Sequence, residues 1–103
     1  MTTVAGITDR LAESWDDFIV ALRSNEGFQK AYYEKLVEVL REAAREWSNA
    51  DAIPRLAANV LVDIVPVTQS AADAYKEPVR QQIYDAGHEL YDLVIDCVAV
   101  NPD

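Results

Sequence analysis

The chain has 103 residues, half of them apolar, and 18 acidic residues outnumber nine basic ones to give a formal net charge of −9. Compact domains usually contain about 100 to 150 residues, which predicts a single domain over residues 1–103. The negative charge repels phosphate backbones and anionic lipid headgroups, so neither nucleic acid nor a membrane is an expected partner. The single cysteine cannot form a disulfide within the chain, and without a signal-like or membrane-spanning apolar run a cytoplasmic location is expected.

The apolar residues predict an all-α protein, a small antiparallel bundle of four to five helices. They recur at helical spacing, and no sustained alternation of period two indicates a strand. The first helix is predicted over residues 8–24, where Leu11 and Phe18 share one apolar arc. Gly27 can adopt the left-handed conformation that ends a helix, and a second amphipathic helix is predicted over residues 28–48.

Prolines divide the second half of the chain. A third helix is predicted over residues 52–65, ended by Pro66, and its broad apolar arc predicts that it is the most buried of the helices. A short helix over residues 68–76 and a last helix over residues 78–98 complete the bundle. Pro78 either kinks a continuous helix or begins a new one, and both alternatives stay open.

The last predicted helix carries four acidic residues on one face. This acidic stripe consists of Asp85, Glu89, Asp92 and Asp96. At about 100° per residue, these side chains fall within an arc of about 60°, with His88 at the border between the stripe and the apolar arc. No lysine or arginine follows Arg80. Gly87 lies inside the apolar arc, where the missing side chain would let a neighbouring helix approach closely.

One interpretation of the stripe is a metal site. Asp85, His88 and Asp92 project from one face at positions i, i+3 and i+7, and D-x-x-H resembles part of the carboxylate and histidine ligand set of di-iron helical bundles. Such a bundle needs a second histidine, and this chain has only one. The three residues are therefore weak candidates for metal ligands, and no metal or other cofactor is predicted.

Catalytic motifs are not found. The only cysteine, Cys97, falls on the apolar side of its helix, away from the only histidine. The carboxylates are expected to be exposed, which gives them no reason to have the shifted pKa values that acid and base catalysis requires. No glycine-rich phosphate loop, CxxC or HExxH motif occurs. The sequence therefore predicts no enzymatic activity.

The favoured hypothesis is a protein-binding protein whose acidic stripe, with His88 at its border, meets the basic surface of a partner. Antitoxins, immunity proteins and phage-encoded inhibitors are small acidic helical proteins of this general kind, which is an analogy of charge and class only. Alternatively, bases of a neighbouring helix or of a second subunit of the same chain neutralise the stripe. The candidate bases are Arg10, Arg41, Arg45, Arg55 and Arg80.

Two further alternatives concern assembly and ligands. Several predicted helices have apolar arcs too broad for one small bundle to cover, which favours a homodimer, and hence a homo-oligomeric structural or assembly protein with an apolar interface. A bundle that binds a metal or another small ligand is the remaining possibility from the residues alone.

The W-S-N sequence at residues 47–49, in a helical chain of this length, resembles the WxG helical hairpins exported by type VII secretion. That family carries W-x-G in its turn and a secretion tail in which an acidic residue follows a tyrosine by four positions. Here Asn49 replaces the glycine, and none of the five tyrosines has that spacing. Three prolines also interrupt the region of the second long helix: Pro54, Pro66 and Pro78. A WxG-type secreted protein is therefore the last alternative.

Overall fold

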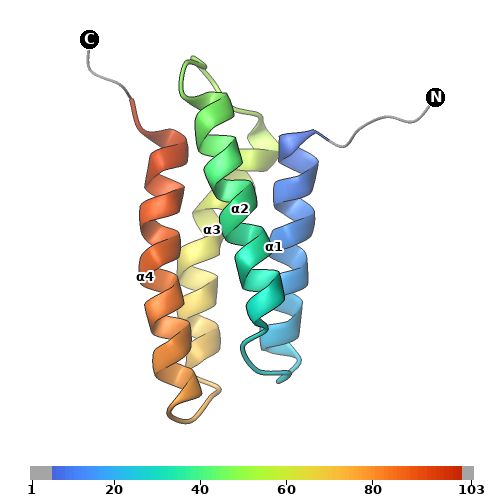
Figure 1. The fold of residues 1–103 in the computed structure, drawn as a ribbon, viewed down its shortest axis with the longest axis vertical. Helices are drawn as coiled ribbons and strands as arrows, with labels where there is room; N and C mark the ends of the chain where they lie inside the picture. The colour runs from blue at the N-terminus through green and yellow to red at the C-terminus, as the bar shows by residue number, and fades with distance from the viewer. Residues whose placement is uncertain (1–5, 101–103) are drawn as a thin grey trace, which may run out of the picture.

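The computed structural model describes residues 6–100, and four helices pack side by side in it (Figure 1). They are α1 (Ile7–Arg23), α2 (Lys30–Trp47), α3 (Arg55–Ala72) and α4 (Val79–Val98). The predicted all-α class is confirmed, with four helices among the described residues. Both ends of the predicted domain, residues 1–5 and 101–103, lie outside the described part of the chain.

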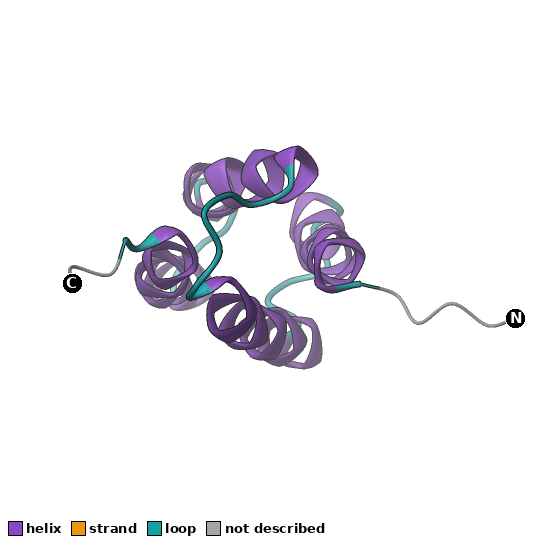
Figure 2. Ribbon diagram, turned by 90° about the horizontal axis from the view of Figure 1, so that it is seen from above, coloured by secondary structure: helices purple, strands orange, loops and turns teal. Residues whose placement is uncertain are grey.

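The helices follow the order α1, α2, α4, α3 around the bundle, because α2 and α4 contact each other and so do α1 and α3. Figure 1 shows that helices consecutive in sequence run in opposite directions. The contacting pairs α2 with α4 and α1 with α3 therefore run in the same direction. The segment 48–54 between α2 and α3 crosses one end of the bundle (Figure 2), which leaves α4 between α2 and α3.

Pro66 does not end a helix, contrary to the prediction. The predicted helices 52–65 and 68–76 are one helix, α3, with Pro66 inside it. An internal proline removes a backbone hydrogen bond and costs about 3 kcal/mol or more. The helix continues because Ile64 and Thr68, on either side of the proline, are completely buried, while the Pro66 ring itself faces solvent. Packing of the inner face therefore outweighs the local cost.

The other helix ends agree more closely with the sequence. Asn25 and Gly27 have φ angles of 61° and 87°, the left-handed conformations that turn the chain between α1 and α2. Because α3 ends at Ala72 and α4 begins at Val79, Pro78 precedes a separate helix and does not kink a continuous one.

The third helix is less buried than the sequence predicts. Six of its 18 residues are buried, against eight of 17 in α1. Leu56 and Val62 are exposed on its outer surface. The broad apolar arc of α3 therefore covers both a core-facing side and a side that no other described helix covers.

Thr68 offers a test of the core. Its hydroxyl is completely buried and has no hydrogen-bond partner among the described residues. An unpaired buried hydroxyl is unfavourable, so we expect Thr68→Val to raise the free energy of unfolding by about 1 kcal/mol. Thr68→Ser, which keeps the hydroxyl and loses the methyl group, should lower it. Urea denaturation measures both, and a destabilised valine variant would show that the hydroxyl has a partner.

Candidate interaction surface on the fourth helix

The acidic stripe lies on the solvent side of α4, as the helical periodicity predicts. Asp85, Glu89, Asp92 and Asp96 are all exposed, and so is His88. The opposite side of α4 is held in the core by buried residues that include Ile83, Leu90 and Leu93. Since these apolar residues recur at helical spacing, their burial fixes the direction of the carboxylates.

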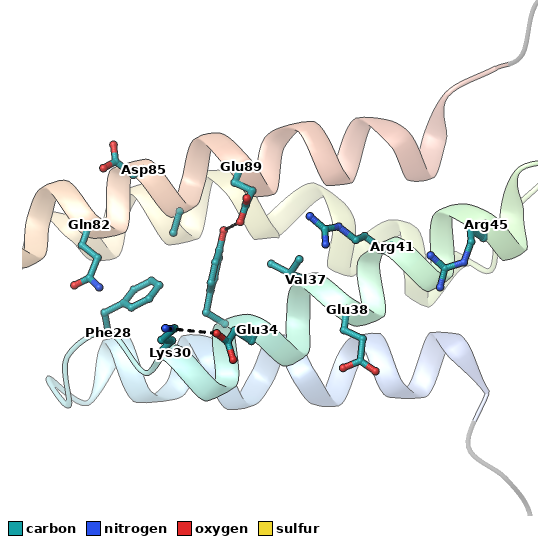
Figure 3. Close-up of a pocket in the computed structure, with 12 residues that line it drawn as sticks. Phe28, Lys30, Glu34, Val37, Glu38, Arg41, Arg45, Gln82, Asp85 and Glu89 are labelled. Carbon is teal, nitrogen blue, oxygen red and sulfur yellow. Dashed lines mark hydrogen bonds and ion pairs between the residues drawn. The ribbon is translucent and has the colours of Figure 1, made fainter.

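The first half of the stripe borders a groove between α2 and α4, which we call the α2–α4 groove (Figure 3). Its volume is about 810 Å³, and Asp85 and Glu89 line its α4 side. The side-chain amide of Gln81 donates a hydrogen bond of 2.9 Å to Asp85, and the hydroxyl of Tyr33 donates one to Glu89. These two carboxylates therefore have partners within the bundle.

The hydroxyl of Tyr33 joins α2 to α4 across the groove. Burial raises its pKa above the ordinary tyrosine value, and the hydrogen bond to Glu89 raises that pKa further. The hydroxyl therefore stays protonated at neutral pH and remains a donor to Glu89. The ring also packs against Phe28 and Phe18, at centroid distances of 5.2 and 5.7 Å, so it is fixed from both ends.

Three bases of α2 line the same groove: Lys30, Arg41 and Arg45. Of these, the sequence indicated only Arg41 and Arg45 as possible neighbours of the stripe. Lys30 pairs with Glu34 at 3.8 Å, and Arg41 and Arg45 extend from α2 in Figure 3. Within residues 6–100, however, no lysine or arginine forms an ion pair with a carboxylate of the acidic stripe. The proximity of α2 and α4 was missed because periodicity shows which face a helix buries, not which helix it meets.

The second half of the stripe has no partner in the described chain. Asp92 and Asp96 accept no hydrogen bond and form no ion pair among residues 6–100. Asp92 and His88 border a second depression, the α3–α4 hollow, whose volume is about 390 Å³. The remaining lining residues of this hollow are Val65, Gln69, Gly87 and Tyr91.

Gly87 forms part of the α3–α4 hollow. A Cβ atom added there would lie 3.3 Å from Cγ of Gln69. The sequence predicted close approach of another helix backbone at this glycine, but the nearest group is the Gln69 side chain.

Two of the other candidate bases are used elsewhere. Arg10 forms a two-pronged ion pair with Glu42 of α2, with nitrogen–oxygen distances of 2.6 and 2.8 Å. The hydrogen bonds from Arg10, and secondarily its charge, lower the pKa of the Glu42 carboxyl. The Nε group of Arg80 donates to the backbone carbonyl of Tyr75 at 2.9 Å. Neither arginine neutralises the acidic stripe.

The Arg10–Glu42 pair predicts a pH effect. A carboxyl whose pKa is lowered by folding stabilises the protein above its unfolded pKa, and that contribution is lost as the pH falls through the folded pKa. We expect Arg10→Gln to raise the pKa of Glu42 toward its ordinary value and to weaken the acid dependence of stability. An NMR titration of the side-chain carboxyl carbon measures this pKa. Arg23→Gln, at an exposed position of α1, is the control, and an unchanged Glu42 pKa in Arg10→Gln would contradict the assignment.

Among residues 6–100, no group of three or more histidine, cysteine, aspartate or glutamate side chains is arranged to hold a metal ion, so Asp85, His88 and Asp92 do not form such a group.

Cys97 is buried and donates a weak hydrogen bond of 3.4 Å to the Leu40 carbonyl. Burial, and to a smaller extent the charge of Asp96, raises the pKa of this thiol to about 11, which keeps it in the unreactive protonated form.

No described helix combines the length and apolar character needed to cross a membrane. Comparison of the chain with protein-family models, curated proteins and solved structures gave no match.

Proposed function

We propose that this chain is a non-enzymatic protein-binding protein that presents the acidic stripe of α4, with His88 at its border, to a basic surface of another protein. The observation that carries this proposal is the exposure of Asp92 and Asp96 without any partner among residues 6–100. Antitoxins, immunity proteins and inhibitors of the same size and charge are the functional class that we favour by analogy.

The position of these charges supports the proposal. The C-terminal end of a helix carries a partial negative charge, so each carboxylate in the last turn costs about 0.3 to 1 kcal/mol. Asp96 lies in the last turn of α4, and α4 has no basic residue there. A positively charged partner would relieve both the repulsion among the carboxylates and their repulsion by the helix dipole. Its approach would also be accelerated by the negative charge of the whole protein.

The proposal predicts the effect of removing the two unpaired charges. We expect the double variant Asp92→Asn with Asp96→Asn to bind fluorescent poly-lysine about tenfold more weakly and with a flatter salt dependence, because attraction of exposed charges is screened by salt. Fluorescence anisotropy over a series of salt concentrations measures both quantities.

The matched control removes two charges from another helix. Asp16 and Asp17 are exposed on α1, across the bundle from α4, and changing both to asparagine alters the net charge equally. If this control weakens binding as much as the α4 variant does, the attraction is a property of the overall charge and the proposed role of the stripe is wrong.

A homodimer with an apolar interface is the second candidate function. It is favoured by four exposed apolar side chains on α3 and α4: Val62, Tyr91, Ile95 and Val98. Static light scattering at micromolar protein concentration tests it. A dimer is the expected result of this candidate, and a stable monomer would count against it.

A further inference from the structure

The outer surface of α3 and α4 carries an apolar ridge. Tyr91, Ile95 and Val98 are spaced for one face of α4, and with Val62 of α3 their exposed fractions lie between 44% and 68%. Tyr91 and Val65 line the same hollow. Because α3 and α4 run in opposite directions (Figure 1), Val62 and Ile95 both lie beyond this hollow toward the same end of the bundle. The four exposed side chains therefore form one ridge.

The α3–α4 hollow lies at one end of this ridge. Gly87 and Gln69 line it, and Val65 and Tyr91 contribute apolar walls. A depression next to an exposed apolar surface suits a partner helix, because one apolar side chain of the partner enters the hollow while the next ones contact the ridge. The spacing of i, i+4 and i+7 on α4 matches the spacing of such contacts.

Charge along one edge of the ridge defines the chemistry of the partner. Asp92 borders the hollow, and Asp96 lies one turn further along α4 beside Ile95. Neither carboxylate has an ion-pair partner among residues 6–100. The outer side of α3 offers little charge, with only Arg55 and Asp63 along the whole helix. The complementary partner therefore has an apolar face with lysine or arginine along one edge.

A second copy of this chain fits that requirement poorly. Each copy carries a formal charge of −9. A two-fold contact buries the same patch of both copies. The carboxylates beside the ridge of each copy would therefore lie together in one interface. Like charges brought together at an interface are unfavourable. A basic partner, in contrast, is attracted electrostatically by the same carboxylates.

We propose that the surface formed by the ridge, the α3–α4 hollow and the carboxylates of Asp92 and Asp96 binds a basic amphipathic helix of another protein. The inference rests on the proposed function and adds the form of the partner: an α-helix that places one apolar side chain in the hollow. Apolar contacts provide most of the buried area, and the carboxylates set the orientation of the helix and accelerate association.

The probe is a labelled synthetic peptide of about 18 residues, or five helical turns, with leucines along one face and lysines along one edge. A peptide of the same composition in scrambled order is the control, because it keeps the charge and loses the apolar face. We expect the amphipathic peptide to bind at least about tenfold more tightly than the scrambled one by fluorescence anisotropy.

Variants of the protein locate the contact. Ile95→Ser and the double variant Asp92→Asn with Asp96→Asn should each weaken binding of the amphipathic peptide by about tenfold. Val20→Ser, at an exposed apolar position of α1, should leave it unchanged. Because all these positions are exposed, thermal unfolding followed by circular dichroism should show that each variant remains folded.

The possible results separate this inference from the proposed function. If the scrambled peptide binds as tightly and Ile95→Ser has no effect, the helical partner is wrong, although the acidic stripe still binds a basic chain. If only the apolar change matters and the charge changes have no effect, both proposals are wrong. If light scattering shows a dimer that Ile95→Ser converts to a monomer, the ridge binds a second copy and this inference is overturned.

Discussion

Replacing Phe18 by alanine is expected to lower the free energy of unfolding by about 3 to 5 kcal/mol, the range measured for buried aromatic residues. Phe18 is completely buried, and its ring contacts Trp15, Phe28 and Tyr33 at centroid distances of 6.4, 5.9 and 5.7 Å. The substitution therefore removes the centre of an aromatic cluster that joins α1 to α2. Since small domains are stable by about 5 to 15 kcal/mol, the loss is a large share of the total.

Urea denaturation measures this effect, with Val20→Ala as the control on the same helix. Val20 is about half exposed, so its truncation should change the free energy of unfolding by less than about 0.5 kcal/mol. A loss of less than about 1 kcal/mol for Phe18→Ala would mean that Phe18 is not at the centre of the core. The cluster also includes two residues of the α2–α4 groove, Phe28 and Tyr33, so the same variant should loosen that groove.

Removal of the Tyr75 hydroxyl has the second largest expected effect, a loss of about 1 to 2 kcal/mol. This buried hydroxyl donates a hydrogen bond of 2.7 Å to the Leu22 carbonyl and accepts one of 3.1 Å from the Gly27 amide. It thereby joins the turn after α3 to the end of α1. Tyr75→Phe leaves the Gly27 amide without this acceptor, and an unpaired backbone group is costly.

Tyr91→Phe is the matched control for this prediction. The Tyr91 side chain is about half exposed, and its hydroxyl has no partner among residues 6–100. The same chemical change there should alter the free energy of unfolding by less than about 0.5 kcal/mol. Equal stability of Tyr75→Phe and the wild-type protein would show that the two hydrogen bonds contribute no net stability.

Much of the fold can be predicted from the sequence, because helical periodicity and turn residues act locally. Gly27 marks the turn after α1, and the predicted helix 78–98 differs from α4 by one residue at its start. The predicted helix end at Pro66 is wrong. Proline is locally unfavourable inside a helix, but the burial of Ile64 and Thr68 stabilises α3 on both sides of Pro66. That packing is set by residues distant in sequence.

The candidate surface could be predicted in part, for the same reason. The direction of the acidic stripe follows from the periodicity of α4 alone. The periodicity does not predict that the first half of the stripe has partners within the bundle and the second half has none. That difference depends on the crossing of segment 48–54, which places α4 between α2 and α3. As a result, Glu89 meets Tyr33 of α2, whereas Asp92 borders a hollow with Val65 of α3. Periodicity contains no information about these neighbours.

The proposed role of the surface depends on the combination of apolar and acidic groups on α4. The apolar ridge by itself would suit any apolar partner, and the carboxylates by themselves would attract any cation. Together they favour a partner that has both an apolar face and a basic edge. The bases of the α2–α4 groove do not compete for Asp92 and Asp96, since no ion pair joins them in the described residues.

The most direct test is an NMR titration of the nitrogen-15-labelled protein with the basic amphipathic peptide, which locates the contact residue by residue. The predicted result is that the largest shifts of backbone amides occur in residues 87–98 of α4 and residues 62–69 of α3, whereas α1 is unaffected. Largest shifts on α1, or shifts spread evenly over all acidic surfaces, would contradict the claim that α3 and α4 form the binding surface.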